Sequence, residues 1–168
     1  AYLAKSGKRV IIADFDPQGN ATSGLGIDKS ALTTTMYDVL VGDAHVSDIL
    51  IETHIDGLAV LPSNPQLAAA EVDLVAVKGR EMLGKHALEE VEADYIFVDC
   101  PPSLGLLSIN ALSAATHIIV PVQAEYYAPE GLGQSLGVVQ RVKQGLNTNL
   151  TPLRVLITLS DSRTALAD

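Results

Sequence analysis

Short apolar runs alternate along the chain with longer segments of helical periodicity. Five runs have the length and the β-branched content of buried strands, and they lie at residues 10–13, 58–61, 95–99, 118–122 and 155–159. Between them apolar residues recur at helical spacing, most clearly over residues 132–146. Strands that alternate with helices predict right-handed crossovers and a mostly parallel sheet with helices on both faces. The predicted fold class is therefore α/β.

The segments that precede the second strand are predicted to be short. Residues 1–5 have the pattern of the last turn of a helix that ends at Gly7. Residues 21–35 are rich in Gly, Ser and Thr, as in a surface loop. Two short helices are predicted at residues 36–41 and 46–51, each with an aspartate near its start, where the helix dipole favours negative charge.

A longer helical region is predicted between the second and third strands. Asn64 is a helix N-cap, and Pro65 follows it in the first turn. Apolar residues then form one face up to about residue 93, and Gly79 is a possible break. A further short helix is predicted at residues 104–115. These helices are interpreted as packing elements.

Three aspartates follow two of the predicted strands. Asp14 and Asp16 come at the end of the first strand, and Asp99 ends the third. Because the carboxyl ends of parallel strands share one edge, where α/β sheets bind ligands, these carboxylates are expected to lie together. They would repel one another without a cation, which favours a metal site beside a nucleotide phosphate. The spacing alone leaves open that Asp14 and Asp16 are turn and cap residues.

Composition limits the remaining classes. The 168 residues carry a net charge of −9, which opposes binding of this stretch to DNA or to anionic lipid. No apolar run approaches the roughly 18 to 20 residues of a membrane span. The single cysteine, Cys100, excludes disulfides and a CxxC metal site within the chain and indicates a reducing compartment such as the cytoplasm. We interpret Cys100 as a small buried residue in a turn.

Three motifs then carry a family resemblance. Residues 14–20 read Asp-Phe-Asp-Pro-Gln-Gly-Asn, residues 98–103 read Val-Asp-Cys-Pro-Pro-Ser, and residues 120–128 read Val-Pro-Val-Gln-Ala-Glu-Tyr-Tyr-Ala. In this order and spacing they resemble the ParA/Soj family of chromosome- and plasmid-partitioning ATPases. That family lies in the deviant-Walker P-loop class that includes MinD. The resemblance extends over essentially the whole chain.

The resemblance implies a P-loop NTPase architecture of the SIMIBI type, with ATP and Mg²⁺ as cofactors. It implies that Asp16 positions the hydrolytic water and that Asp14 and Asp99 lie at the Mg²⁺, which Asp99 reaches through water. The implied nucleotide contacts, from the γ-phosphate loop and from the region near the base, are Pro101, Pro102, Ser103, Thr158, Asp161 and Arg163.

Other polar residues of the motifs have two possible roles each. Glu125, Tyr126 and Tyr127 either contact the nucleotide or a second subunit, or shape the turn into the next helix. Ser103 and Asn110 either belong to the γ-phosphate loop or cap and face its helix. The sequence does not choose between these roles.

The resemblance also implies parts that this stretch lacks. The family's Gly-rich loop with two lysines would precede Ala1, and its basic DNA-binding part would follow Asp168. We therefore expect residues 1–168 to be a partial single α/β ATPase domain, inactive alone, in which the strand at 95–99 lacks the family's first strand as its neighbour.

The complete protein is then expected to form a homodimer when ATP is bound and to respond to a ParB-type partner. It is expected to bind DNA without sequence preference, through regions outside this stretch. It is expected to lie at the nucleoid in the cytoplasm and not at a membrane.

Two other classes account for part of the pattern. A phospho-acceptor receiver domain also gathers three aspartates at a sheet edge, but it requires a lysine at the end of a later strand. Residues 122–123 and 159–160 supply none. A family-like scaffold that binds partners without hydrolysing a nucleotide is the second alternative, and the intact Asp16 argues against it.

Overall fold

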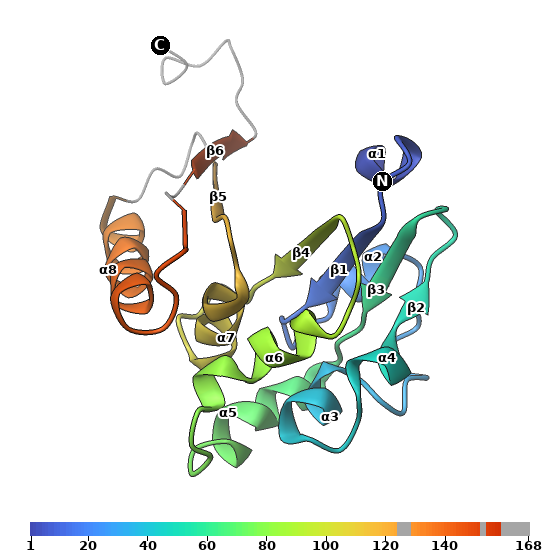
Figure 1. Cartoon of the computed structure of the whole chain (residues 1–168), viewed down its shortest axis with the longest axis horizontal. Helices are drawn as coiled ribbons and strands as arrows, with labels where there is room; N and C mark the ends of the chain where they lie inside the picture. The colour runs from blue at the N-terminus through green and yellow to red at the C-terminus, as the bar shows by residue number, and fades with distance from the viewer. Residues whose placement is uncertain (124–128, 152–153, 159–168) are drawn as a thin grey trace. The chain divides into compact units, whose positions relative to one another are not determined.

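Strands and helices alternate along residues 1–123, 129–151 and 154–158, the residues that the computed structural model describes. The chain divides into two compact units, residues 1–114 and 115–168 (Figure 1). The prediction of a single domain over residues 1–168 stays a prediction. Within the described ranges no helix has the length and apolar character that crossing a membrane requires.

The first unit is built on a four-stranded sheet of order β2-β3-β1-β4. Its strands are β1 (Val10–Asp14), β2 (Ile51–Glu52), β3 (Leu58–Leu61) and β4 (Tyr95–Asp99). β1 is central and pairs in parallel with β3 and β4. The predicted α/β class with a mostly parallel sheet is confirmed. The exception is β2, which pairs antiparallel with β3 at the edge and was predicted as the end of a helix.

Short helices connect these strands. They are α1 (Tyr2–Lys5), α2 (Asn20–Gly24), α3 (Met36–Val41), α4 (Val46–Ile49), the 3₁₀ helix η1 (Pro65–Ala69), α5 (Ala70–Asp73), the 3₁₀ helix η2 (Arg80–Met82), α6 (Leu83–Glu89) and α7 (Leu106–Ala114). Side-chain hydrogen bonds cap the start of two of these helices, α3 and η1. The Thr35 and Asp38 side chains form a capping box at α3. The Asn64 side chain accepts from the Gln66 N–H at the start of η1, as predicted.

Two helix predictions need correction. Residues 21–35 are not loop throughout, because α2 occupies their start. Residues 64–93 are several short helices and not one long one. The chain turns at residues 74–79, and Gly79 has a positive φ of 75°, which a side chain would disfavour. The break predicted at Gly79 is confirmed.

The core lies mainly on one face of this sheet. Alternate residues of β1, such as Ile11 and Ala13, pack there against helices α3 to α7 (Figure 1). On the other face Val10 and Leu58 pack with Ala4 of α1. That cover stops at β1 and β3. On the same face of β4 the rings of Tyr95 and Phe97 stack on each other and stay 44% and 45% exposed.

The second unit contains a parallel pair of strands. β5 (Ile119–Gln123) and β6 (Arg154–Thr158) are joined through α8 (Pro129–Gly145). The Asn147 side-chain amide donates to the Ala115 carbonyl at 2.7 Å, and the Thr151 N–H donates to the Thr116 carbonyl at 3.0 Å. These contacts hold the chain after α8 to the chain before β5. The predicted strand–helix–strand order is confirmed for this unit.

Candidate functional site

The carboxyl ends of β1 and β4 bring two aspartates side by side. Asp14 and Asp99 occupy the same register position on these neighbouring parallel strands, so their side chains leave the same face of the sheet. The Phe15 N–H then donates to the Asp99 carbonyl at 2.8 Å and extends the pairing by one residue. The expectation that the acidic strand ends share one edge is confirmed. The two aspartates nevertheless lie in different environments.

Asp14 is completely buried and its carboxylate is fully engaged with the protein. Its Oδ2 accepts from the Thr22 N–H at 2.8 Å and from the Thr22 hydroxyl at 2.7 Å. Its Oδ1 accepts from the Asp16 N–H at 3.2 Å. Three donors therefore occupy most of the roughly four acceptor positions of a carboxylate. Asp14 thus organises the chain that follows β1.

Asp16 lies in a tight turn directly after that strand. Its Oδ1 accepts from the Gln18 N–H and its carbonyl accepts from the Gly19 N–H, both at 2.9 Å. Between the two aspartates Phe15 is fully buried in the core and anchors the turn. The Asp16 side chain is partly exposed, and its Oδ2 has no hydrogen-bond partner among the described residues. One oxygen of this carboxylate therefore shapes the turn, and the other can accept from a ligand or a water.

Asp99 is the exposed member of the group. The pKa of its carboxyl is raised by desolvation and then by the negative charges of Asp14 and Asp16, and the Cys100 N–H lowers it in part. A bound cation would offset the negative charge of this exposed carboxylate and its two acidic neighbours.

The described residues contain no group of three or more Asp, Glu, His or Cys side chains that could hold a metal ion by themselves. Mg²⁺ beside a nucleotide needs fewer protein ligands, because it binds one or two carboxylates together with waters and phosphate oxygens. The exposed Asp99 fits that arrangement as a ligand. Asp14 fits the same arrangement as a neighbouring carboxylate, which Thr22 already holds by hydrogen bonds.

The loop that follows Asp99 carries three of the predicted cofactor contacts. Pro102 and Ser103 are exposed, and Pro101 is partly exposed. The Ser103 carbonyl accepts from the Ser108 hydroxyl in α7, so the loop is tied to the first turns of that helix. Its predicted nucleotide contacts stay predictions.

Two residues near this loop, Asn110 and Cys100, have surroundings that the sequence did not predict. The role of Asn110 was left open, and Cys100 was predicted to be buried. Asn110 is buried and forms hydrogen bonds with Leu106 of α7, Gly84 of α6 and Arg80 of η2, so it packs α7 against these elements and does not enter the loop. Cys100 is exposed, and its prediction as a buried residue was wrong. Desolvation of its thiol and the charges of Asp99 and Asp16 nonetheless raise its pKa to about 11. Cys100 is therefore a neutral thiol near pH 7.

The remaining predicted contacts lie in the second unit. Thr158 is described, and its hydroxyl donates to the Val122 carbonyl at 3.4 Å, across the β5–β6 pair. Asp161 and Arg163 lie outside the described residues, as do Glu125, Tyr126 and Tyr127. Their predicted roles stay predictions.

Two residues that the sequence did not single out complete the site. The Thr22 hydroxyl donates to Asp14 and accepts from the Ser63 N–H at 3.0 Å. The Ser63 hydroxyl donates to the Asp16 carbonyl at 2.9 Å. All three side chains of Asp14, Thr22 and Ser63 are fully buried. Thr22 lies in a Gly/Ser/Thr-rich stretch, and Ser63 directly follows a strand and a proline, which are weak signals of a site.

Comparisons with known proteins agree on the family and the fold of the chain. The sequence model of the AAA_31 family, described as an AAA domain, matches residues 1–152. The sporulation initiation inhibitor protein Soj of Bacillus subtilis is 54% identical over 99% of the chain, and the chain covers 66% of that protein. The chromosome partitioning protein ParA of Myxococcus xanthus is 46% identical over 99% of the chain, which covers 60% of it. The chain thus spans less than two thirds of the length of these relatives.

The fold is shared with a solved structure that contains a nucleotide. Cobyrinic acid a,c-diamide synthase from Mycobacterium smegmatis, with a bound ATP analogue and magnesium, superposes with a TM-score of 0.91 at 41% identity. The match covers 98% of this chain and 68% of that one. The region it covers includes both aspartate-bearing strand ends.

Proposed function

The chain belongs to the AAA_31 family and is similar to Soj and ParA proteins, and we propose that the complete protein is a Mg²⁺-dependent ATPase that partitions chromosomes or plasmids. One observation carries the proposal. Asp14 and Asp99 lie in register at the carboxyl edge of the sheet, and Asp16 follows at once in a turn, within a chain 54% identical to Soj. This is the edge at which α/β proteins bind nucleotides.

Each carboxylate has a distinct role in the proposal. Mg²⁺, when bound with the nucleotide, supplies positive charge that offsets the charge of the phosphates. Asp99 is exposed and lies beside the negative charges of Asp14 and Asp16, so it would hold that ion. Asp14 keeps its hydrogen bonds to Thr22 and sets the position of the turn.

Asp16 is the residue that acts on the water in this proposal. The carboxylate oxygen that is not used by the Gln18 N–H orients the water that attacks the γ-phosphate. The loop at residues 101–105 lies directly after Asp99 and contacts the nucleotide phosphates through Pro101, Pro102 and Ser103. Thr158, Asp161 and Arg163 contribute near the base. Catalysis then comes from positioning and electrostatics.

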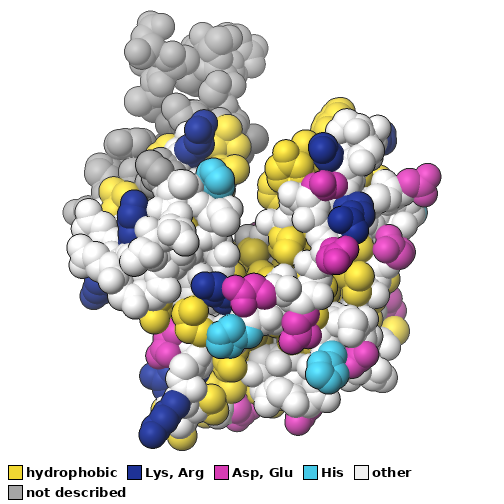
Figure 2. Space-filling view, viewed as in Figure 1, with side chains coloured by type: hydrophobic (Ala, Val, Ile, Leu, Met, Phe, Trp, Pro, Cys, Tyr) yellow, Lys and Arg dark blue, Asp and Glu magenta, His cyan; other side chains and the backbone are white. Residues whose placement is uncertain are grey.

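The proposal extends to partners. ATP binding produces a homodimer that binds DNA without sequence preference, and a ParB-type protein stimulates hydrolysis and release. The protein acts in the cytoplasm at the nucleoid. Figure 2 shows acidic and basic side chains interspersed on the visible face, and the chain carries a net charge of −9. DNA contacts are therefore assigned to regions outside residues 1–168.

Replacement of Asp16 by Ala in the complete gene product tests the function. ATP turnover should fall to the background rate, while ATP binding and dimerisation with Mg²⁺ persist. Asp56→Ala is the matched control, because it removes an exposed loop aspartate in the same unit. Turnover of the Asp16→Ala protein at the parent rate would refute the role of Asp16. Failure of the parent to bind ATP would favour the non-hydrolysing scaffold.

A second candidate comes from the solved relative that is named as an amide synthase. ATP-dependent amide formation would use the same phosphate and Mg²⁺ site to transfer the γ-phosphoryl group to a carboxylate substrate with release of ADP, and an amine would then displace phosphate to give the amide. The two functions differ in what accelerates turnover. A partitioning ATPase hydrolyses ATP faster when DNA and its partner protein are added, whereas an amide synthase requires a carboxylate acceptor and an amine donor.

A further inference from the structure

Two loops flank the aspartates at the edge of the sheet. The first is the turn at residues 15–19, which contains Asp16 and follows β1. The second is the loop at residues 100–105, which follows Asp99 and leads into α7. A third segment leaves the same edge after β3 and contacts both. We call this segment, residues 63–71, the bridge.

The amino-terminal end of the bridge is bonded to the Asp16 turn. The Ser63 hydroxyl donates to the Asp16 carbonyl at 2.9 Å, and Ser63 itself is fully buried. The backbones also touch, because a Cβ at Gly19 would lie only 2.9 Å from the Ser63 carbonyl oxygen. Gly19 has a positive φ of 61°, so both its conformation and the lack of space require glycine. The turn is therefore packed closely against the start of the bridge.

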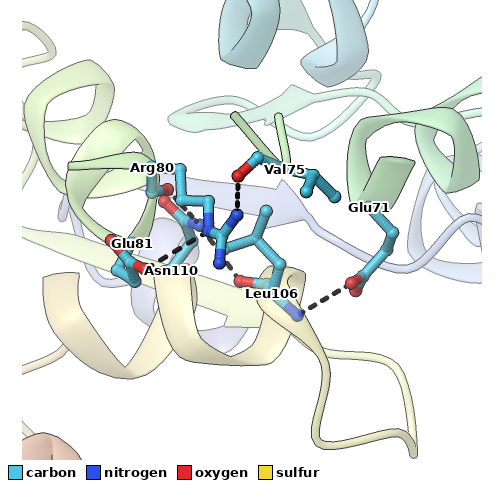
Figure 3. A network of polar contacts seen from close by, with 6 residues as sticks. All are labelled: Glu71, Val75, Arg80, Glu81, Leu106 and Asn110. Carbon is cyan, nitrogen blue, oxygen red and sulfur yellow. Dashed lines mark hydrogen bonds and ion pairs between the residues drawn. The ribbon is translucent and has the colours of Figure 1, made fainter. Parts of the chain in front are cut away.

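The other end of the bridge is bonded to the start of α7. One carboxylate oxygen of Glu71 accepts from the Leu106 N–H at 3.0 Å, as Figure 3 shows. The other accepts from the Leu107 N–H at 3.2 Å. These are the first N–H groups of α7, which lack partners within the helix. A negative charge is also favoured at this positive helix end. Glu71 thus caps a helix that begins 35 residues later in the sequence.

The fit around this cap is tight. A Cβ at Gly105 would lie 3.0 Å from Glu71 Cδ and closer still to its Oε1. Glycine at residue 105 therefore leaves the space that the Glu71 carboxylate occupies. The last residue of the loop and the capping carboxylate fit each other sterically as well as through hydrogen bonds.

The body of α7 is held separately from its first turn. Asn110, which is fully buried, accepts from the Gly84 N–H at 2.8 Å and donates to the Arg80 carbonyl at 2.8 Å. It also donates to the Leu106 carbonyl at 3.0 Å (Figure 3). Because Asn110 anchors the helix, loss of Glu71 would free the loop end without releasing α7 from the core.

We propose that Glu71 is a positioning residue that, through the bridge, couples the loop after Asp99 to the turn that carries Asp16. The hydrogen bonds at Ser63 and Glu71 connect the Asp16 turn, and the first turn of α7 where the loop after Asp99 ends, to one short, partly helical segment. A displacement of either loop is then transmitted to the other. The part of this inference that concerns catalysis rests on the proposed ATPase function, and the structural coupling does not.

Hydrogen exchange in the complete gene product tests the coupling directly. In Glu71→Ala the amides of Leu106 and Leu107 should exchange at least about tenfold faster, because each loses a charge-assisted hydrogen bond. Exchange should also rise in residues 15–22, which Glu71 does not touch. Glu89→Ala is the matched control, since it removes an exposed glutamate whose ion pair within the described part of the chain is with Lys85, also on α6. Faster exchange at α7 with residues 15–22 unchanged would overturn the coupling.

Kinetics of the same variants test the catalytic consequence. Glu71→Ala should lower kcat for ATP hydrolysis about tenfold or more and leave KM within about threefold, as expected for lost positioning. Glu71→Gln keeps one acceptor oxygen and should recover part of the rate. A rise in KM with unchanged kcat would overturn the positioning role. Absence of ATP turnover in the parent would refute the proposed function, and the exchange result would still decide the coupling.

Discussion

Replacement of Thr22 by Val removes one hydroxyl from the buried network around Asp14 and leaves the side-chain volume almost unchanged. The Thr22 N–H remains and still donates to Asp14 Oδ2. Two interactions are lost. Asp14 loses the hydroxyl donor at 2.7 Å, and the Ser63 N–H loses its acceptor at 3.0 Å.

Both losses occur where water does not compensate, since Asp14, Thr22 and Ser63 are fully buried. A hydrogen bond to a charged group contributes about 1.5–3 kcal/mol, and a buried donor without a partner costs about 1–3 kcal/mol. Partial relaxation reduces the total. We therefore expect Thr22→Val to lower the free energy of unfolding by about 3 kcal/mol, which is a large part of the stability of a typical domain.

Thr22→Ser is the matched control because it keeps the hydroxyl and loses only a methyl group, which contributes about 1 kcal/mol. Urea denaturation of the complete gene product, followed by circular dichroism, gives both values. Val should lower the midpoint clearly more than Ser does. Equal losses for Val and Ser, or a larger loss for Ser, would show that the hydroxyl does not stabilise the network and would refute the reasoning.

Two further substitutions test the charge and the packing of the site. Asp99→Asn should raise the thermal midpoint at pH 7, because the raised pKa of Asp99 means that its ionisation destabilises the folded protein. The gain should vanish as the pH falls below the ordinary range of an aspartate, where both proteins are neutral at residue 99, and a gain independent of pH would argue against a cost of ionising Asp99. Gly84→Ala should lower the free energy of unfolding by about 1–3 kcal/mol, since its Cβ would lie 2.9 Å from Phe15 Cε1. In the same denaturation assay Gly24→Ala, where a Cβ meets nothing within 4 Å, should be neutral or stabilising.

The position of the site could be predicted from local sequence alone. The three parallel strands of the first unit, β1, β3 and β4, each end where an apolar run stops, and parallel pairing then sets the register. For that reason Asp14 and Asp99 had to meet at one edge once β1 and β4 were neighbours. The breaks at Asn64 and Gly79 were also predictable, because capping and a positive φ each need particular residue types.

The contacts that organise the site could not be predicted in this way. Thr22 and Ser63 are 41 residues apart, and Glu71 lies 35 residues before the N–H group that it caps. Such hydrogen bonds depend on which short helix packs beside which loop. A polar residue that makes such a long-range hydrogen bond has no distinctive neighbours in the sequence. The helical periodicity of residues 64–93 also failed to predict one long helix, because short 3₁₀ and α segments separated by a turn bury Leu67, Leu74 and Leu88 and leave Val75 exposed.

Asp14 and Asp99 show how the path of the chain gives two equivalent residues different roles. They share a register position on neighbouring strands, so the strands themselves do not distinguish them. After β1 the chain returns through α2, and Thr22 covers Asp14 with two donors. After β4 the chain leaves through residues 100–105 and is held at α7 by Glu71, and Asp99 is exposed. One carboxylate is therefore used to build the turn that carries Asp16, and the other keeps its charge available to a ligand. The difference follows from what comes after each strand. Changes at Thr22 should therefore act first on Asp14, whereas changes at Glu71 should act first on the loop after Asp99 and reach the Asp16 turn only through the bridge.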